Sequence, residues 1–183
     1  MIDGGANIGS FSLYLLAHVP GVRIHAYEPS EDTFALLSAN ARTRASEEWH
    51  VHRAALWREC GSVSFEMRDW STSRRIGDAG GSVSVPAVDL AKVLADAGDG
   101  PVELMKVDIE GAEADFLMGK EPLLGRVRHL LLELHTDRLD VAPLVASLGT
   151  LYPHAYRISR QGSSKPVVLW TPRGDLDLPP YVL

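Results

Sequence analysis

Acidic side chains follow directly after several short apolar stretches of this 183-residue chain. Asp3, Glu28 and Asp108 each come immediately after such a stretch, and Glu133 and His135 end another one. Short apolar runs of this kind are typical of strands in a sheet that is buried on both faces. Because such sheets bind ligands beyond the carboxyl ends of their strands, we expect these side chains to share one rim.

The first of these acids opens a glycine-rich segment, Gly4-Gly5-Ala6-Asn7-Ile8-Gly9, which is followed by an apolar run from Ser10. This order predicts a strand end, a tight turn and the start of a helix. Glycine lets a ligand approach the backbone closely, and the first turn of a helix has N–H groups without intrahelical acceptors. We therefore predict a nucleoside-type cofactor at this turn.

Two kinds of cofactor compete for this turn. The pattern Gly4-x-Ala6-x-x-Gly9 nearly matches the dinucleotide fingerprint. Glu28 lies 19 residues after Gly9, where an acid that binds ribose is expected. However, the Asp3 carboxylate would repel a pyrophosphate and attract the sulfonium and amino groups of S-adenosylmethionine. The sign of this charge favours S-adenosylmethionine, and an NAD(P)-binding oxidoreductase is the alternative.

The predicted contacts with the cofactor follow from side-chain chemistry. Asp3 would lie near its positive end, and Glu28 would accept hydrogen bonds from two ribose hydroxyls. Asn7 and the neighbouring backbone N–H groups would bind its carboxylate. The small side chains of Ala54 and Ala55 would let an adenine ring lie close to the backbone, or would only allow close packing. The predicted cofactor-binding residues are Asp3, Gly5, Asn7, Gly9, Glu28, Ala55 and Asp108.

The candidate catalytic groups follow two later strands. Asp108 would lie where the methyl group meets the acceptor, and a helix N-cap is its alternative role. Glu133 and His135 are two residues apart on one strand, so they face the same side. They are candidates for a general base or a metal ligand, and a buried structural histidine is the alternative for His135. The predicted catalytic residues are Asp108, His135 and Glu133; no metal ligand is assigned, and a magnesium site from Asp108, Glu110 and Glu133 is an alternative.

The order of helical and extended patterns predicts the fold. Strand-like segments at 22–27, 49–56, 102–107 and 128–135 alternate with helix-like segments at 10–18, 30–41, 89–97, 110–118 and 139–148. Two hairpins are predicted, one from 62–67 and 82–86 around a polar loop at 68–81, the other from 155–159 and 166–170. This alternation predicts an α/β domain with a mostly parallel sheet, helices on both faces and a reversed last strand.

One helix face and one sheet edge can also be predicted. In the segment 10–18, spacings of three and four would bury Phe11, Tyr14, Leu15 and His18. The sequence starts inside the predicted first strand, so we expect an N-terminally short domain. We also expect this strand to have an exposed edge, which a homodimer would cover.

Composition and charge limit the function classes. The net charge of −6 and the isoelectric point near 5.6 argue against a nucleic-acid-binding surface. The single cysteine, Cys60, excludes an internal disulfide and fits the reducing cytoplasm. The sequence has no apolar run of about 18 residues that would predict a membrane span. We expect one domain over residues 1–183 that acts on a small molecule.

Several motifs together resemble the FkbM-type family of S-adenosylmethionine-dependent methyltransferases. They run from the first residues to His135, and the most specific is the Lys-Val-Asp-Ile-Glu-Gly-Ala-Glu segment at 106–113. The others are Ile2-Asp3-Gly4-Gly5-Ala6-Asn7-Ile8-Gly9-Ser10-Phe11-Ser12, Tyr27-Glu28-Pro29, Ala54-Ala55-Leu56 with Gly61, and Leu131-Leu132-Glu133-Leu134-His135.

The resemblance implies a Rossmann-like class I methyltransferase fold of seven strands with the last one reversed. It also implies that Asp3, the turn at Gly5 and Glu28 bind S-adenosylmethionine. It further implies O-methylation of a hydroxyl on a small natural product or sugar. The residues themselves do not separate O- from N- or C-methylation, and a non-catalytic remnant that only binds the cofactor is another alternative.

Overall fold

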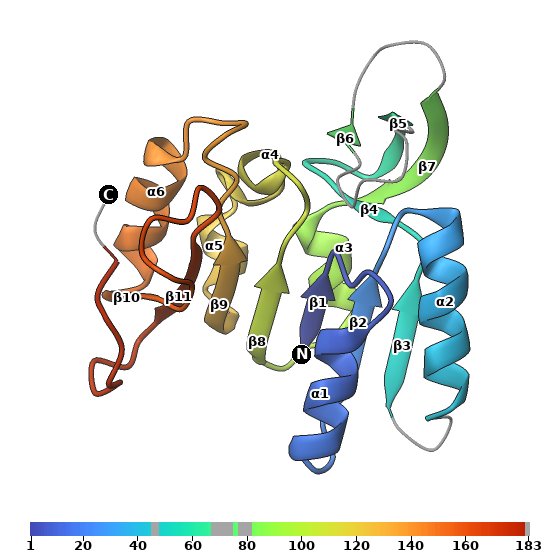
Figure 1. The fold of residues 1–183 in the computed structure, drawn as a ribbon, viewed down its shortest axis with the longest axis horizontal. Helices are drawn as coiled ribbons and strands as arrows, with labels where there is room; N and C mark the ends of the chain where they lie inside the picture. Colours follow the sequence, from blue (N-terminus) through green and yellow to red (C-terminus); the bar gives the residue numbers. More distant parts are fainter. Residues whose placement is uncertain (45–47, 67–74, 77–81, 182–183) are drawn as a thin grey trace.

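The computed structural model describes residues 1–44, 48–66, 75–76 and 82–181. A seven-stranded sheet in the order β10-β11-β9-β8-β1-β2-β3 forms its centre (Figure 1). The strands are β1 (Ile2–Gly4), β2 (Ile24–Tyr27), β3 (Trp49–His52), β8 (Val102–Val107), β9 (Val127–Glu133), β10 (His154–Arg157) and β11 (Val167–Thr171). β11 runs antiparallel to both β9 and β10, and the other neighbouring strands of this sheet pair in parallel, which confirms the predicted parallel sheet with a reversed last strand.

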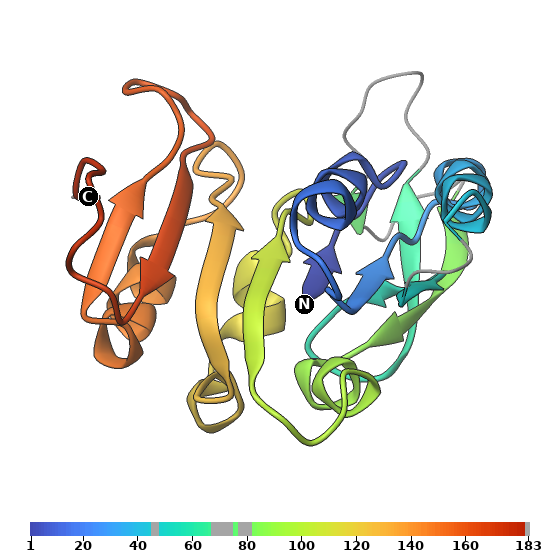
Figure 2. The ribbon, with the colours of Figure 1, turned by 90° about the horizontal axis from the view of Figure 1, so that it is seen from below.

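Helices cover both faces of this sheet (Figure 2). One face carries α1 (Ser10–His18) and α2 (Glu31–Arg42), which pack against β2 and β3 through Leu16, Leu37 and Trp49. The other face carries α3 (Leu90–Asp96), α5 (Glu121–Leu124) and α6 (Ala142–Leu151), and the short α4 (Glu113–Leu117) joins the same larger core. These two cores hold the central strands in place between the helices, so their carboxyl ends stay at one edge.

A second, four-stranded sheet lies beyond that edge, in the order β4-β7-β5-β6 (Figure 1). Its strands are β4 (Ala55–Leu56), β5 (Gly61–Glu66), β6 (Arg75–Ile76) and β7 (Ser82–Val88). The antiparallel pairing of β5 with β7 confirms the predicted hairpin. Most of the polar loop at 68–81 lies outside the described residues.

Two predicted elements differ in their extent. The strand predicted at 49–56 is wrong as one strand, because it splits into β3 in the main sheet and β4 in the second sheet. The helix predicted from Glu110 starts only at Glu113, because Glu110 and Gly111 have positive φ values of 60° and 104°. A turn with left-handed residues cannot belong to a right-handed helix.

The buried face predicted for α1 is also wrong. Tyr14 is 59% exposed, and the buried residues of α1 are Ser12 and Leu16. Ser12 is turned inward because its hydroxyl donates a hydrogen bond of 2.7 Å to the Asp3 carboxylate. A polar contact with the site therefore sets the rotation of this helix, which an apolar periodicity cannot reveal.

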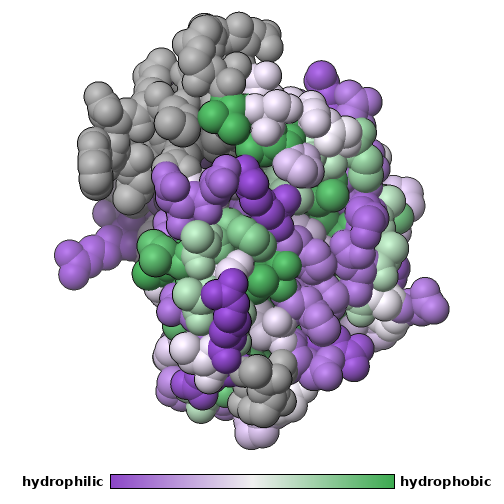
Figure 3. All heavy atoms as spheres, turned by 90° about the vertical axis from the view of Figure 1, so that its right-hand side faces the viewer, coloured by the Kyte–Doolittle hydropathy of each residue, from purple (hydrophilic) through white to green (hydrophobic). Residues whose placement is uncertain are grey.

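The predicted exposed edge of the first strand is not present. β1 pairs in parallel with β2 on one side and with β8 on the other, so it lies in the middle of the sheet. An exposed edge of β1 therefore no longer supports a homodimer, and the homodimer stays a prediction. β3 forms one edge of the seven-stranded sheet, and the surface near β3 and α2 mixes hydrophobic and hydrophilic side chains (Figure 3).

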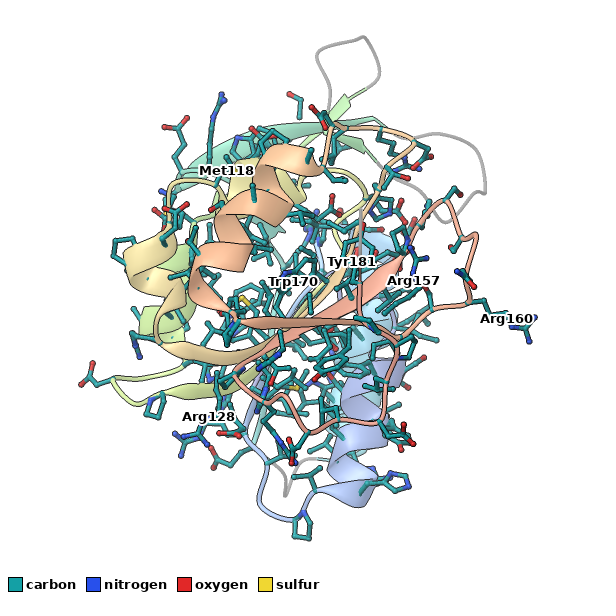
Figure 4. All side chains as sticks on the ribbon, turned by 90° about the vertical axis from the view of Figure 1, so that its left-hand side faces the viewer. Met118, Arg128, Arg157, Arg160, Trp170 and Tyr181 are labelled. Atoms are coloured by element: carbon teal, nitrogen blue, oxygen red, sulfur yellow. The ribbon has the colours of Figure 1, made fainter. Side chains whose placement is uncertain are left out.

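The terminal hairpin is closed by aromatic contacts. Figure 4 shows Arg157, Trp170 and Tyr181 close together at the β10–β11 end of the sheet. The Tyr181 ring meets Trp170 edge-on at 6.1 Å, and the Arg157 guanidinium lies 5.3 Å above the Tyr181 ring. Among the described residues, no helix has the length and apolarity that a membrane crossing requires.

Candidate active site

The strand register brings the predicted acids to one edge of the sheet. Gly4 at the end of β1 is level with Tyr27 of β2 and with Val107 of β8. Val107 in turn is level with Leu132 of β9. Because all these strands are parallel, the residues that follow them meet at the same rim, as the sequence predicts (Figure 1).

The glycine-rich turn satisfies most of its own backbone donors. The N–H groups of Ala6, Asn7 and Gly9 donate to the Tyr27 carbonyl, the Glu28 carboxylate and the Ala6 carbonyl, respectively. The Ile8 N–H donates to the side-chain oxygen of Asn7 at 2.7 Å. The described residues provide no side-chain cap for α1. The first turn of α1 therefore offers the donors that a cofactor carboxylate would need.

Two glycines of this turn are required by contacts within the protein itself. A Cβ on Gly5 would lie 1.8 Å from the Asp108 carbonyl oxygen, and one on Gly9 would lie 2.7 Å from the Trp49 ring. Both residues also have positive φ values, 68° and 90°. The glycines thus let the turn pack against the end of β8 and against β3, in addition to any approach of a ligand.

Replacing Gly5 tests this packing. We expect Gly5→Ala to lower the free energy of unfolding by about 3 kcal/mol or more, because a clash with backbone adds to the left-handed conformation. Gly21→Ala is a matched control, since Gly21 has a φ of 72° but nothing within 4 Å of its added Cβ. Gly21→Ala should lower the free energy of unfolding by only about 1–2 kcal/mol, the cost of a left-handed backbone conformation for alanine. Urea unfolding followed by circular dichroism measures both, and equal losses would contradict the packing role.

Glu28 connects the turn to the next helix. Its two carboxylate oxygens accept hydrogen bonds from the Asn7 N–H at 3.0 Å and the Ser30 N–H at 2.9 Å, and the residue is 8% exposed. Asn7 adopts a positive φ of 52°, which this residue type tolerates. Glu28 therefore fixes the shape of the turn, and its contact with ribose stays a prediction.

Asp3 does not form part of an open, negatively charged rim. It is wholly buried, and the Lys106 ammonium lies 3.5 Å from its carboxylate. Lys106 also donates to the carbonyl oxygens of Gly4 at 3.1 Å and Gly5 at 2.8 Å. Burial raises the pKa of Asp3, while Lys106 and the hydrogen bond from Ser12 act in the opposite direction. The protein thus supplies its own cation where the sequence predicted only the cofactor's positive charge.

The three predicted catalytic residues come together. Ligand-type atoms of Asp108, Glu133 and His135 all lie within 4.8 Å of one another. Asp108 and Glu133 are partly exposed, whereas His135 is wholly buried. Burial raises the pKa of Glu133, and the charge of Asp108 raises it further. The cluster thus combines the partly exposed carboxylates of Asp108 and Glu133 with the buried imidazole of His135.

Glu113 holds the imidazole. Its carboxylate lies 2.8 Å from His135 Nδ1 and also accepts the N–H groups of Ile109 and Gly111 at 3.2 and 3.1 Å. Burial lowers the pKa of His135, but the hydrogen bond and charge of Glu113, with the charge of Glu110, leave it above its ordinary value. Glu113 is fully buried, so it acts on the ring and not on a ligand.

Glu110 pairs with basic side chains. Arg138 Nη1 lies 2.8 Å from its carboxylate and 2.8 Å from its carbonyl oxygen, and Lys165 Nζ lies 3.4 Å from the carboxylate. These contacts stabilise the left-handed backbone at Glu110. The alternative magnesium site was predicted from Asp108, Glu110 and Glu133. In the structure, the group whose ligand atoms lie together contains His135 instead of Glu110.

A pocket of about 240 Å³ opens beside Glu110. Its lining combines one aromatic ring with charged side chains: Trp57, Ile109, Glu110, Gly111, Ala112, Asp115 and Arg138. Ala55, predicted to lie near adenine, instead packs with Val63, Val85 and Ala87 in the core of the second sheet. The structure favours its packing interpretation, and its contact with a cofactor stays a prediction.

Comparison with known proteins decides between the alternative cofactors. The family model for the FkbM methyltransferase domain matches residues 3–154. The chain belongs to the FkbM methyltransferase family. The dinucleotide alternative is thereby set aside, and S-adenosylmethionine is the donor that the family implies.

Individual relatives agree with this assignment. The 31-O-demethyl-FK506 methyltransferase FkbM of Streptomyces tacrolimicus is 27% identical over 181 residues, covering 81% of this chain and 70% of that protein. The hexuronic acid methyltransferase AglP of Haloferax volcanii is 28% identical over 149 residues, covering 79% and 60%. The solved FkbM methyltransferase of Methylobacillus flagellatus KT has a TM-score of 0.66 at 16% identity, covering 93% of this chain and 42% of that one. The last comparison confirms the class I fold.

Four side chains that contact the candidate site are not among the predicted site residues. Lys106 has a local signal, since it is a charged residue between the buried Met105 and Val107 of β8. Glu113 belongs to the acidic segment at 106–113, but its contact with His135 joins two different strand ends. Arg138 and Lys165 come from loops and reach Glu110 from 28 and 55 residues away along the chain. Such loop contacts have no periodicity that a sequence pattern can reveal.

Proposed function

We propose that this FkbM-family chain transfers a methyl group from S-adenosylmethionine to a hydroxyl of a small natural product or sugar. The observation that carries the proposal is the cluster of Asp108, Glu133 and His135 beside the glycine-rich turn. The family supplies the donor, and the cluster supplies groups that can accept the proton of a hydroxyl. Two observations support O-methylation: this cluster, and the names of relatives that methylate 31-O-demethyl-FK506 and hexuronic acid.

The residues around the turn fit the cofactor. Glu28 has carboxylate oxygens at the end of β2, which can accept further hydrogen bonds from ribose hydroxyls. The first turn of α1 offers N–H donors for a carboxylate. Asp108 is partly exposed beside Gly5, where the carboxylate would face the positive sulfur. Asp3 is wholly buried against Lys106, whereas Asp108 is partly exposed, so Asp108 is the acid we assign to this role.

The chemistry needs a methyl donor, an oxygen and a proton acceptor. When bound, S-adenosylmethionine supplies a methyl group: an oxygen–carbon bond forms to the acceptor as the carbon–sulfur bond breaks, and the electron pair of the broken bond stays on sulfur. One member of the cluster of Asp108, Glu133 and His135 takes up the single hydroxyl proton, so that charge balances. The protein contributes mainly position, which in well-aligned reactions accounts for about 7–11 kcal/mol of the barrier.

The pocket beside Glu110 is the proposed site of the acceptor. Its Trp57 ring offers a face for a sugar or another ring, and Glu110, Asp115 and Arg138 offer hydrogen bonds for hydroxyl groups. Glu110 is shared between this pocket and the catalytic cluster, because its carboxylate lies 3.3 Å from His135 Nε2. An acceptor bound there would thus reach the proton acceptors.

Calorimetric titration with S-adenosylhomocysteine tests the cofactor part. We expect binding that weakens about 10–100-fold in Glu28→Gln, because hydrogen bonds to a charged group contribute about 1.5–3 kcal/mol. Glu59→Gln is the control, since Glu59 is an exposed glutamate outside the site. Thermal melting verifies that both variants fold. Absence of binding to the unchanged protein would contradict the proposal.

A transfer assay tests the acceptor part. Labelled S-adenosylmethionine is incubated with hydroxylated sugars and macrolides and, separately, with amines. We expect label on oxygen. Label on nitrogen would overturn the O-methylation proposal, and cofactor binding without transfer to any acceptor would favour the non-catalytic alternative.

A further inference from the structure

We propose that Asp108, Glu133 and His135 form a binding site for one divalent metal cation. Asp108 follows β8, and Glu133 and His135 lie at and just after the end of β9, so the site joins two adjacent strands. One oxygen from each carboxylate and one ring nitrogen lie within 4.8 Å of one another. That spacing lets a single ion contact all three with modest side-chain adjustment.

The buried imidazole points to a ligand. His135 is wholly buried, and its Nε2 atom has no hydrogen-bond partner among the described residues. This nitrogen faces the cluster, 4.0 Å from the Asp108 carboxylate. An unsatisfied buried polar atom is costly, about 1–3 kcal/mol, so a structure that keeps one calls for an explanation. A cation bound to Nε2 would satisfy it.

Glu113 prepares this nitrogen for a metal. Its carboxylate lies 2.8 Å from His135 Nδ1 and therefore favours the tautomer with the proton on Nδ1. Nε2 then has a lone pair directed at the cluster. A carboxylate behind a histidine ligand is the usual arrangement at metal sites, where it fixes the ring and its tautomer. Glu113 is thus a positioning residue, because it does not face the cation.

A protonated His135 is the competing account. The Glu110 carboxylate lies 3.3 Å from Nε2, and an imidazolium there would form an ion pair. However, Glu110 is already paired with Arg138 at 2.8 Å and with Lys165 at 3.4 Å. The Lys106 ammonium lies 3.7 Å from Asp108, but it is shared with the buried Asp3 carboxylate at 3.5 Å. A divalent ion would bring two positive charges to Asp108 and Glu133, whereas an imidazolium would bring one and share it with Glu110.

The donor set indicates the kind of ion. Two carboxylates and one imidazole suit Mn²⁺, which lies between the oxygen-preferring Mg²⁺ and the nitrogen-preferring Zn²⁺. Such an ion would contact the acceptor hydroxyl and favour loss of its proton. This catalytic use rests on the proposed function, whereas binding of the ion does not.

Electron paramagnetic resonance of Mn²⁺ added to the protein without cofactor tests the site. We expect one ion per chain, with a nitrogen coupling from an imidazole in the pulsed spectrum. Glu133→Gln, Asp108→Asn and Glu113→Gln should each weaken binding about 10-fold or more. Glu110→Gln should bind like the unchanged protein. Glu103→Gln is the matched control, since Glu103 lies at the opposite end of β8 and pairs with Arg128.

The outcomes separate the accounts. Absence of Mn²⁺ binding, or binding without a nitrogen coupling, would overturn the site. A loss in Glu110→Gln that equals the loss in Glu133→Gln would also overturn it, because the ion would then use the oxygen-only set. Titration of the same samples with S-adenosylhomocysteine keeps failure of the metal site distinct from failure of the proposed function. Thermal melting verifies that each variant is folded.

Discussion

Asp108→Asn should lower kcat/KM for methyl transfer by about 100–10,000-fold, the usual contribution of a positioned proton acceptor. The substitution keeps the shape of the side chain and removes its charge. It leaves the backbone intact, including the hydrogen bond of 3.1 Å from the residue 108 N–H to the Gly4 carbonyl. The loss follows because Asp108 lies between the turn at Gly5 and the buried His135.

Steady-state kinetics with a labelled donor measures this change. We expect the loss in kcat with smaller effects on cofactor binding, because the missing charge acts where the reacting atoms meet. Asp99→Asn is the control, since Asp99 is exposed in the turn before β8. Full activity in Asp108→Asn would remove this residue from the reaction. A loss confined to KM would assign it to binding alone.

Lys106→Met should lower the free energy of unfolding by about 3–5 kcal/mol, the usual cost of removing one member of a buried ion pair. Asp3 would then keep a carboxylate inside the core without its ammonium partner at 3.5 Å. The Gly4 and Gly5 carbonyls would lose a donor as well. Lys92→Met is the matched control, because Lys92 pairs with Asp96 at the surface of α3 and should contribute only about 0.3–0.5 kcal/mol.

A double variant identifies the cause of that loss. Asp3→Asn in the Lys106→Met protein removes the unpaired charge and should restore much of the stability, as urea unfolding with circular dichroism would measure. Recovery would remain incomplete because the two carbonyls still lack Lys106. If both substitutions together cost the sum of their separate effects, the two side chains would not be coupled and our account of Asp3 would be wrong.

The sequence by itself determined the order of the elements and the positions of the acids at strand ends. These features depend on local information: an apolar run predicts a strand, a glycine-rich segment predicts a turn, and a residue after a strand lies at its carboxyl end. The parallel sheet with its reversed strand follows from the same alternation, and Asp108, Glu133 and His135 do meet at one rim.

Only the tertiary structure decided which groups act on one another. Lys106 reaches the turn from 101 residues away, and Glu113 meets His135 across 22 residues. Ser12 faces inward because it binds Asp3, and Ala55 enters the second sheet because β4 pairs with β7. The partners of a buried charge are set by packing between distant segments, and composition and periodicity carry no record of that packing.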